Sequence, residues 1–347
     1  MTKKGTALTR LNPDQHVLDK LAEPAPQGSR FARSLFSRYL DLNMPLVQRR
    51  PKACFSSVEN LGRVANRLGF AGPAPAEAAA LFGPMPNKQA RAIAAEITGL
   101  SFKNELFMQM VVKKGLQASE PFIEGNGTSR LGQLAKGKSG ALFLFAHTGP
   151  LAGTTAAFHK AGVPVLLIRA GKSPYRLPPG MEECAINNSA AGHAYVLKKA
   201  LDTIKNGRFV LIAFDATYGG AIVKDIPFMG RRFQFRRGLA MLVRRTGVPA
   251  IPVSAAWLPG DCAFKFVVHP PLPVPETDKR NKRLYDAMVT TEAAKWLENL
   301  IRRNPGQVQW HLLRQILRDG RPPGPDSPIP PRTAPATGQP ARPSPQP

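Results

Sequence analysis

The chain has 347 residues, of which 43% are hydrophobic, so it can bury a large core in one domain or two and is not a disordered protein. Its formal net charge of +25 favours polyanionic partners, such as nucleic acid, anionic lipid or an acidic carrier protein. The three cysteines lie far apart in the sequence and predict neither a disulfide framework nor a zinc site. No apolar run reaches the roughly 18 to 20 residues of a membrane-spanning helix, and the N-terminus lacks the pattern of an export signal. We therefore expect a cytoplasmic protein that contacts membranes only peripherally.

Composition and periodicity divide the chain into four segments. Residues 1–30 mix Pro, Gly and charge without periodicity, and residues 319–347 are rich in Pro, Ser, Ala and Thr, so both ends are predicted to be disordered. Residues 31–135 are predicted to be helical, with Leu61, Val64 and Leu68 at helical spacing. Residues 136–318 are predicted to form an α/β domain. Its expected strands are 141–146, 163–168, 209–213 and 248–253, and its expected connecting helices are 151–161, 193–205 and 238–246.

Polar residues follow three of these expected strands. The strands are almost continuously apolar, which predicts a mostly parallel sheet with helices on both faces, and such sheets bind ligands past the carboxyl ends of their strands. His147 suits a general base if a second group orients its ring, but it is equally compatible with a residue that begins a helix. Arg169 has the charge to hold a phosphate or an oxyanion, although solvated arginines are commoner at such places. Asp215 leads into the loop Ala216-Thr-Tyr218-Gly-Gly220, and the three strand ends together favour a site.

A cationic run follows, at Arg231-Arg-Phe-Gln-Phe-Arg-Arg237, and Arg244 and Arg245 reinforce it. We expect this run to contact a phosphorylated glycolipid or an acidic carrier protein. Interleaved aromatic and basic residues are also compatible with single-stranded nucleic acid, which we rank lowest because no known nucleic-acid motif is present. The histidines show no metal-ligand spacing, so we expect no metal.

Four segments in this order resemble the lipid A late acyltransferases, the lauroyl and myristoyl transferases of the lysophospholipid acyltransferase superfamily. His147 stands where that family begins its H-x-x-x-x-[D/E] motif, and Ile168-Arg169 stands like the arginine after the next strand. Residues 197–253 resemble its K-x-G strand, D-x-x-Y-G loop, [V/I]-P-F-[F/M]-G segment and [A/V]-P-[V/I]-x-P strand. Residues 304–314 resemble its closing P-E-Q-x-x-W-x-x-R-R element. The resemblance spans residues 85–318.

The resemblance implies a glycerol-3-phosphate acyltransferase-like fold and transfer of a fatty acyl chain to a hydroxyl of a lipid or glycolipid acceptor. The donor would be acyl carrier protein or a CoA thioester, no cofactor would be needed, and the anionic acceptor would place the protein on the inner membrane of a bacterium. His147 and Asp215 would be catalytic. The implied substrate-binding residues are Arg169, Tyr218, Arg236, Arg237, Gln307 and Trp310.

The chain also departs from the family pattern. Ala152 stands five residues after His147, where the family has its acid, and Gly306 replaces the acid of P-E-Q. The family's N-terminal membrane anchor is not evident. Three hypotheses follow from these departures. Asp215 supplies the missing carboxylate of a transferase, or His147 acts in a transferase without an acid partner, or the protein is a catalytically impaired homologue that binds lipid.

Overall fold

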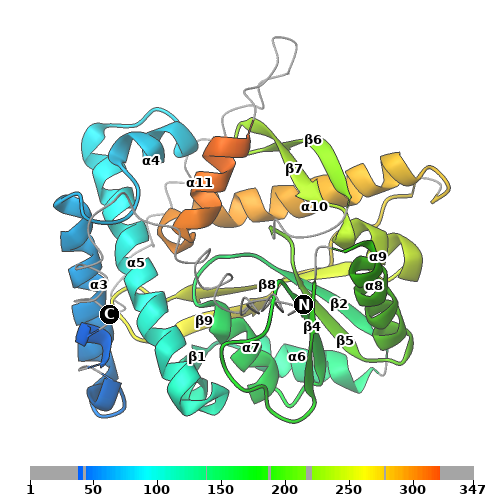
Figure 1. Cartoon of the computed structure of the whole chain (residues 1–347), viewed down its shortest axis with the longest axis horizontal. Coiled ribbons are helices and arrows are strands. Elements are labelled where there is room, and N and C mark those ends of the chain that lie inside the picture. Colours follow the sequence, from blue (N-terminus) through cyan, green and yellow to red (C-terminus); the bar gives the residue numbers. More distant parts are fainter. Residues whose placement is uncertain are drawn as a thin grey trace, which may run out of the picture.

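The computed structural model describes residues 38–41, 44–137, 139–186, 189–215, 221–276 and 279–320 (Figure 1). The N-terminal segment 1–30, which the sequence predicts to be disordered, lies outside these residues. Of the predicted tail 319–347, residues 319 and 320 are described, and Asp319 is the last residue of a helix. The predicted fold class is confirmed: a mostly parallel seven-stranded sheet is flanked by helices, and a helical region precedes it. Among the described residues, no helix is both long and apolar enough to cross a membrane.

The helical region lies at one end of the sheet. Helices α3 and α5 run side by side (Figure 1), and they approach closely because Gly62 faces α5: a Cβ there would come within 2.8 Å of the Thr98 carbonyl oxygen. A two-residue strand from this part of the chain joins the sheet edge. The elements are α3 (Pro51–Arg67), α4 (Pro75–Phe82), α5 (Asn87–Lys114), the 3₁₀ helix η1 (Leu116–Phe122), β1 (Ile123–Glu124) and α6 (Gly127–Lys136).

The sheet has the strand order β1-β9-β8-β2-β5-β3-β4. The five strands from β8 to β4 are parallel, whereas β9 runs antiparallel to β8 and carries β1 parallel to itself. The four predicted strands are confirmed with small shifts at their ends, and three further strands of this sheet, β1, β4 and β9, were not predicted. The strands are β2 (Ala141–Phe145), β3 (Val165–Arg169), β4 (Met181–Ala185), β5 (Phe209–Ala213), β8 (Ala250–Trp257) and β9 (Phe264–Val268).

Helices cover both faces of the sheet, which explains why the central strands are apolar throughout. Along β2, Phe143 belongs to one buried cluster, whereas Leu142 and Leu144 belong to the other. Alternate side chains of a strand point to opposite faces, so each face of β2 is buried under its own layer. The remaining helices are α7 (Leu151–Lys160), α8 (Ala190–Lys205), α9 (Gly238–Thr246), α10 (Lys282–Arg303), η2 (Pro305–Gln307) and α11 (Trp310–Asp319).

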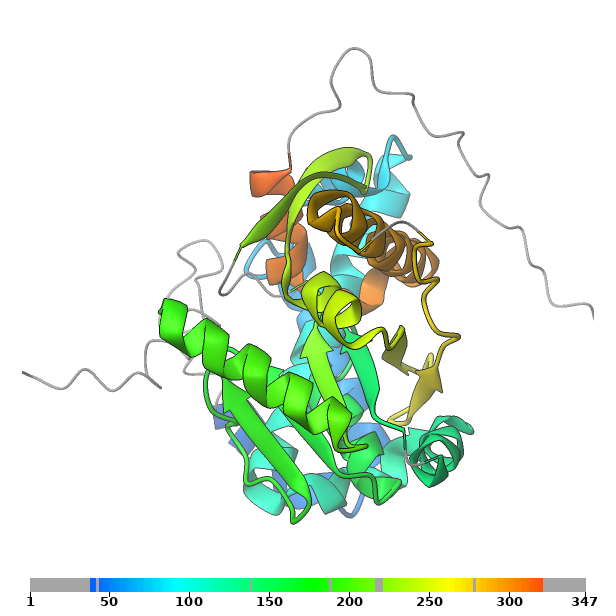
Figure 2. The ribbon, with the colours of Figure 1, turned by 90° about the vertical axis from the view of Figure 1, so that its right-hand side faces the viewer.

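The predicted cationic run is half of a β-hairpin that packs against α10 (Figure 2). Strands β6 (Ile222–Phe228) and β7 (Arg231–Arg236) are joined through Met229 and Gly230, which have φ values of 53° and 71°. Two consecutive left-handed residues match the twist of a tight hairpin. Phe233 and Phe235 are buried and alternate with more exposed polar residues, so the aromatic residues of this run belong to the core.

Candidate functional site

The register of the sheet brings His147 and Asp215 together. β2 and β5 are parallel neighbours in which Phe145 lies opposite Ala213. The backbone N–H of Phe214 continues this ladder by donating to the carbonyl oxygen of Phe145 at 2.8 Å. Each of the two polar residues stands two positions beyond this last pair, so both leave the sheet at the same edge.

Asp215 holds His147 through two hydrogen bonds. One carboxylate oxygen accepts from the backbone N–H of His147 at 2.7 Å, and the other lies 2.8 Å from its Nδ1. The Asp215 side chain is fully buried, whereas the His147 side chain keeps 23% of its surface exposed. With Nδ1 directed at the carboxylate, Nε2 is the nitrogen that can accept a proton from a substrate.

Burial and charge act in opposite directions on this pair. Burial by itself lowers the pKa of His147, but the charge and hydrogen bond of Asp215 outweigh it, so this pKa lies above its ordinary value of 6.5. Burial likewise raises the pKa of Asp215, and the charge and hydrogen bonds of His147 bring it below its ordinary value of 3.8. Asp215 is therefore ionised at neutral pH, which makes His147 a stronger base.

Arg169 lies on the other side of Asp215. It is the last residue of β3, which pairs with β5 opposite β2. Its Nη1 donates to the Ser173 hydroxyl at 2.6 Å, and its charge lowers the pKa of His147. The three polar residues that the sequence placed at strand ends thus meet at one edge of three adjacent strands.

The loop after His147 is tied to the segment that precedes α11. Gly149 donates from its backbone N–H to the Gln307 carbonyl oxygen at 2.6 Å, and Gln309 donates in the same way to His147 at 3.1 Å. Gly149 has a φ of 59°, and a Cβ there would overlap the carbonyl oxygen of Ala255. The Gln307 side chain bonds both backbone groups of Trp257, at 3.0 and 3.2 Å. Gln307 therefore clamps this loop to β8.

This clamp brings a second histidine, His311, to the site. Its ring lies edge-on to the ring of His147, with 5.1 Å between centroids. Burial lowers the pKa of His311 to about 4, and the charge of His147 acts in the same direction. The residue as a whole is exposed to solvent, which weakens the effect of burial, but the charge of His147 also favours the neutral ring. The sequence reasoning missed His311, although it is the residue after Trp310 in the closing element.

At Ala152 and Gly306, where the chain lacks the acids of the family pattern, the structure shows which residues stand nearby. Ala152 lies in the first turn of α7 and is only 1% exposed, so this helix carries no carboxylate toward His147. The carboxylate that bonds His147 belongs instead to Asp215, two residues past the end of β5. At Gly306, the space that a side chain would need is filled by the carboxylate of Glu96 from α5. Glu96 therefore brings an acid to the position of Gly306, and Asp215 brings one to His147.

Several cations of the predicted run have structural partners. Arg237 and Arg244 both pair with Asp286 of α10, which is 1% exposed, and the Arg244 bond is 2.9 Å long. Arg231 donates to the carbonyl oxygen of Gly320 at 3.2 Å. These arginines therefore join the hairpin and α9 to α10, and they join the hairpin to the end of α11.

The other predicted substrate-binding residues are placed as follows. Arg236 is the last residue of β7 and is partly buried. Trp310 begins α11, and the guanidinium of Arg314 lies over its ring at 5.3 Å. Tyr218 lies outside the described residues. Substrate binding by these residues, and by Arg169, Arg237 and Gln307, stays a prediction.

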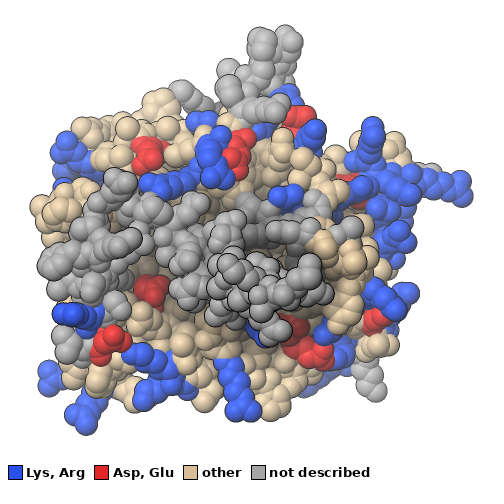
Figure 3. Space-filling model, in the orientation of Figure 1, with Lys and Arg blue, Asp and Glu red and all other residues tan. Residues whose placement is uncertain are grey.

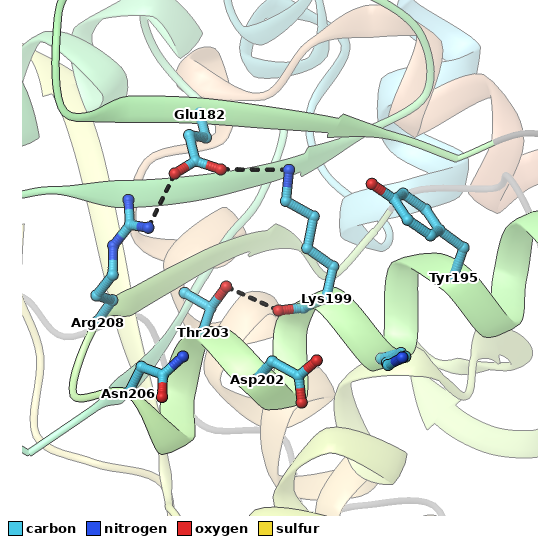
Figure 4. A pocket seen from close by; sticks show the side chains of 8 residues that line it. Glu182, Tyr195, Lys199, Asp202, Thr203, Asn206 and Arg208 are labelled. Carbon is cyan, nitrogen blue, oxygen red and sulfur yellow. Dashed lines mark hydrogen bonds and ion pairs between the residues drawn. The ribbon is translucent and has the colours of Figure 1, made fainter.

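A separate hollow of about 350 Å³ lies between β4, α8 and the start of β5 (Figure 4). Within it, Glu182 pairs with Lys199 at 3.2 Å and with Arg208 at 2.8 Å. Arg208 precedes β5 whereas Asp215 follows it, so this hollow lies at the opposite edge of the sheet from His147. Its ion pairs join α8 to the sheet and add nothing to the site.

Comparison with known families gives one match over most of the chain. The family model described as bacterial lipid A biosynthesis acyltransferase matches residues 51–318, which include every described element of the site. A comparison with curated proteins gave no match.

Proposed function

Because the chain belongs to the bacterial lipid A biosynthesis acyltransferase family, whose members transfer acyl chains to lipid acceptors, we propose that it acylates a lipid or glycolipid hydroxyl with His147 as general base. The donor in this proposal is the thioester of acyl carrier protein or of CoA. The observation that carries the proposal is the His147–Asp215 pair, with its bond of 2.8 Å and its buried carboxylate. A histidine that a buried carboxylate orients is suited to take a proton from a hydroxyl.

In the proposed reaction, the acceptor hydroxyl gives its proton to Nε2 of His147 while its oxygen attacks the thioester carbonyl carbon. A C–O bond forms, and the C–S bond then breaks. The leaving sulfur takes the proton from the imidazolium, which returns His147 to its neutral form. Asp215 stays ionised throughout and stabilises the imidazolium. The reaction as proposed uses neither a metal nor an organic cofactor.

Arg169 is the proposed partner of the negative charge in this reaction. Its guanidinium ends the neighbouring strand and is electrostatically coupled to His147. An arginine has five N–H donors, so Arg169 keeps donors available beyond its hydrogen bonds to Ser173 and Tyr175. They suit either the oxyanion that develops on the thioester or a phosphate of the acceptor.

The alternative hypothesis is a catalytically impaired homologue that binds lipid. It rested on Ala152, which removes the acid from the expected motif. The bonds from Asp215 to His147 weaken that reason, because a carboxylate at this place can orient the ring from β5 as well as from α7. We therefore favour the transferase.

The test is acyl transfer from a labelled acyl carrier protein thioester to mixed lipid acceptors, with formation of the labelled ester as the readout. His159→Ala is the matched control for His147→Ala, because His159 also pairs with a carboxylate, Glu120, at 2.7 Å but lies near the far end of α7. We expect ester from wild type and from His159→Ala, and none above background from His147→Ala. Bound lipid without ester in the wild-type protein would instead support the impaired homologue.

A further inference from the structure

Helix α3 has two faces of different chemistry. It lies on the flank of the molecule against α5 (Figure 1), and its inner face buries Phe55 and Val58 completely. Its outer face carries Leu61, Val64 and Leu68, which are 37%, 48% and 62% exposed. The spacings of three and four residues place these side chains in one stripe. Phe70 follows the helix and is 57% exposed, so four large apolar side chains within ten residues face outward.

The exposed charges of α3 and of the residues just before it are positive, and one of them, Lys52, interacts with the charge of Asp261. The acid of α3 is Glu59, which is buried and paired with Arg63 at 2.5 Å and with Lys103 at 3.0 Å. Exposed cations stand at both ends of the helix: Arg49, Arg50 and Lys52 at its start, and Arg67 at its end. The outer face of α3 therefore combines exposed apolar side chains with positive charge and presents no acid from the helix.

The combination identifies the class of partner. Exposed apolar side chains are unfavourable in water. A nucleic acid would form ion pairs with the cations, but it would leave the leucines and the valine without apolar contacts. An anionic bilayer satisfies both, because the apolar side chains enter the boundary of the acyl chains while the cations remain among the head groups. We propose that the outer face of α3, together with Phe70, is the surface by which this protein docks on anionic lipid bilayers. This inference rests on the proposed function only in that the acceptor is a membrane lipid.

The cationic run at Arg231–Arg237 is less suited to this role. Three of the arginines in that region, Arg231, Arg237 and Arg244, have structural partners, and its phenylalanines are buried. The positive charge of the protein is widely spread, since Lys and Arg side chains appear at several places on the face shown in Figure 3. Charge alone does not select a docking surface, whereas the exposed apolar stripe of α3 does.

The first experiment is sedimentation of the full chain with vesicles of phosphatidylcholine, with and without phosphatidylglycerol. We expect the wild-type protein to bind the vesicles that contain phosphatidylglycerol. Leu68→Ser/Phe70→Ser should lower the partition coefficient about tenfold or more. Arg67→Glu should lower it about fivefold or more. The control is Leu284→Ser, because Leu284 is also exposed, at 46%, and follows the exposed cations Lys282 and Arg283 on α10. It should bind as wild type does. Equal losses in the control and the α3 variants, or none in the α3 variants, would overturn the proposal.

A second measurement asks whether another part of the chain covers the stripe. An environment-sensitive fluorophore is attached to the cysteine of a Leu68→Cys/Cys262→Ser variant. The label reacts at position 68 because the other two cysteines, Cys54 and Cys184, are buried. We expect its emission to shift to the blue only when phosphatidylglycerol vesicles are added. Emission that is already blue-shifted without vesicles, and unchanged by them, would mean that the chain covers its own stripe and would refute membrane docking there.

Transfer activity separates this proposal from the proposed function. With a detergent-dispersed acceptor, Leu68→Ser/Phe70→Ser should transfer acyl chains as wild type does, because the substituted side chains lie outside the His147 site. With the acceptor embedded in vesicles, it should lose activity in parallel with binding. Wild-type protein that binds vesicles but transfers nothing would remove the proposed function and leave the docking surface standing.

Discussion

Replacing Asp215 by Asn should uncouple the base from the group that orients it. The carboxylate now accepts from two donors of the same residue, the backbone N–H and Nδ1 of His147. An amide has one oxygen, so if it keeps the backbone bond its NH₂ group faces the ring. Nδ1 must then present its lone pair, and the hydrogen moves to Nε2, where the base is needed. General-base catalysis contributes about 10²- to 10⁴-fold, and we expect kcat/KM to fall within this range.

The pH profile gives a second, independent readout. Only neutral His147 can accept the proton, so activity rises as pH increases through its pKa, which in the wild type lies above 6.5. In Asp215→Asn the charge that raises this pKa is gone, while burial and Arg169 still lower it. The acid limb of kcat/KM should therefore move to lower pH even though the rate falls.

The assay is the transfer reaction with a detergent-dispersed acceptor, followed as a function of pH, with thermal unfolding to show that the variant is folded. Asp202→Asn is the control, because Asp202 is an exposed aspartate in the hollow at the other edge of the sheet. It should leave both the rate and the profile unchanged. A folded Asp215→Asn protein with wild-type kcat/KM, or a lower rate with an unmoved acid limb, would refute the proposed role of this carboxylate.

Three further predictions test the surroundings of the site. Gly149→Ala should lower the free energy of unfolding, measured by chemical denaturation, by more than the roughly 1–2 kcal/mol that a left-handed alanine costs, because its Cβ overlaps β8. Gly230→Ala is the control, because Gly230 has a similar φ but open space around it, so this variant measures the backbone cost alone. Asp286→Ala should cost about 3–5 kcal/mol by the same method, because it leaves two arginines without their buried partner. His311→Lys should move the acid limb of the pH profile to lower pH, because a fixed cation beside His147 opposes its protonation; an unmoved limb would mean that the two rings are not electrostatically coupled.

Local sequence was sufficient to place the polar residues at strand ends. The apolar runs before His147 and Asp215 are short and nearly uninterrupted, which is typical of central strands in a parallel sheet, and both strands form where predicted. β4 was missed because its sequence, Met-Glu-Glu-Cys-Ala, has two acids and no apolar run. It lies at the edge of the sheet, where polar side chains reach solvent more easily.

The hairpin shows how composition can hide a strand. Arg231–Arg237 reads as a cationic cluster when its residues are counted, but its phenylalanines alternate and point into the core. The partner of Arg237, Asp286, lies about fifty residues further along the chain. No local pattern links these segments, because the ion pair exists only once α10 packs beside the hairpin.

By itself, the sequence determined the fold class, the family and the candidate base, because strand-forming runs and their terminal polar residues are local features of the chain. Only the tertiary structure decided that Asp215 is the partner of His147. That pairing depends on β5 lying beside β2 in register, although 68 positions separate the two residues. The tertiary structure also brought His311 to the site, through backbone bonds between the His147 loop and the segment before α11. Contacts of this kind depend on strand order and loop closure, which the identity of neighbouring residues does not encode.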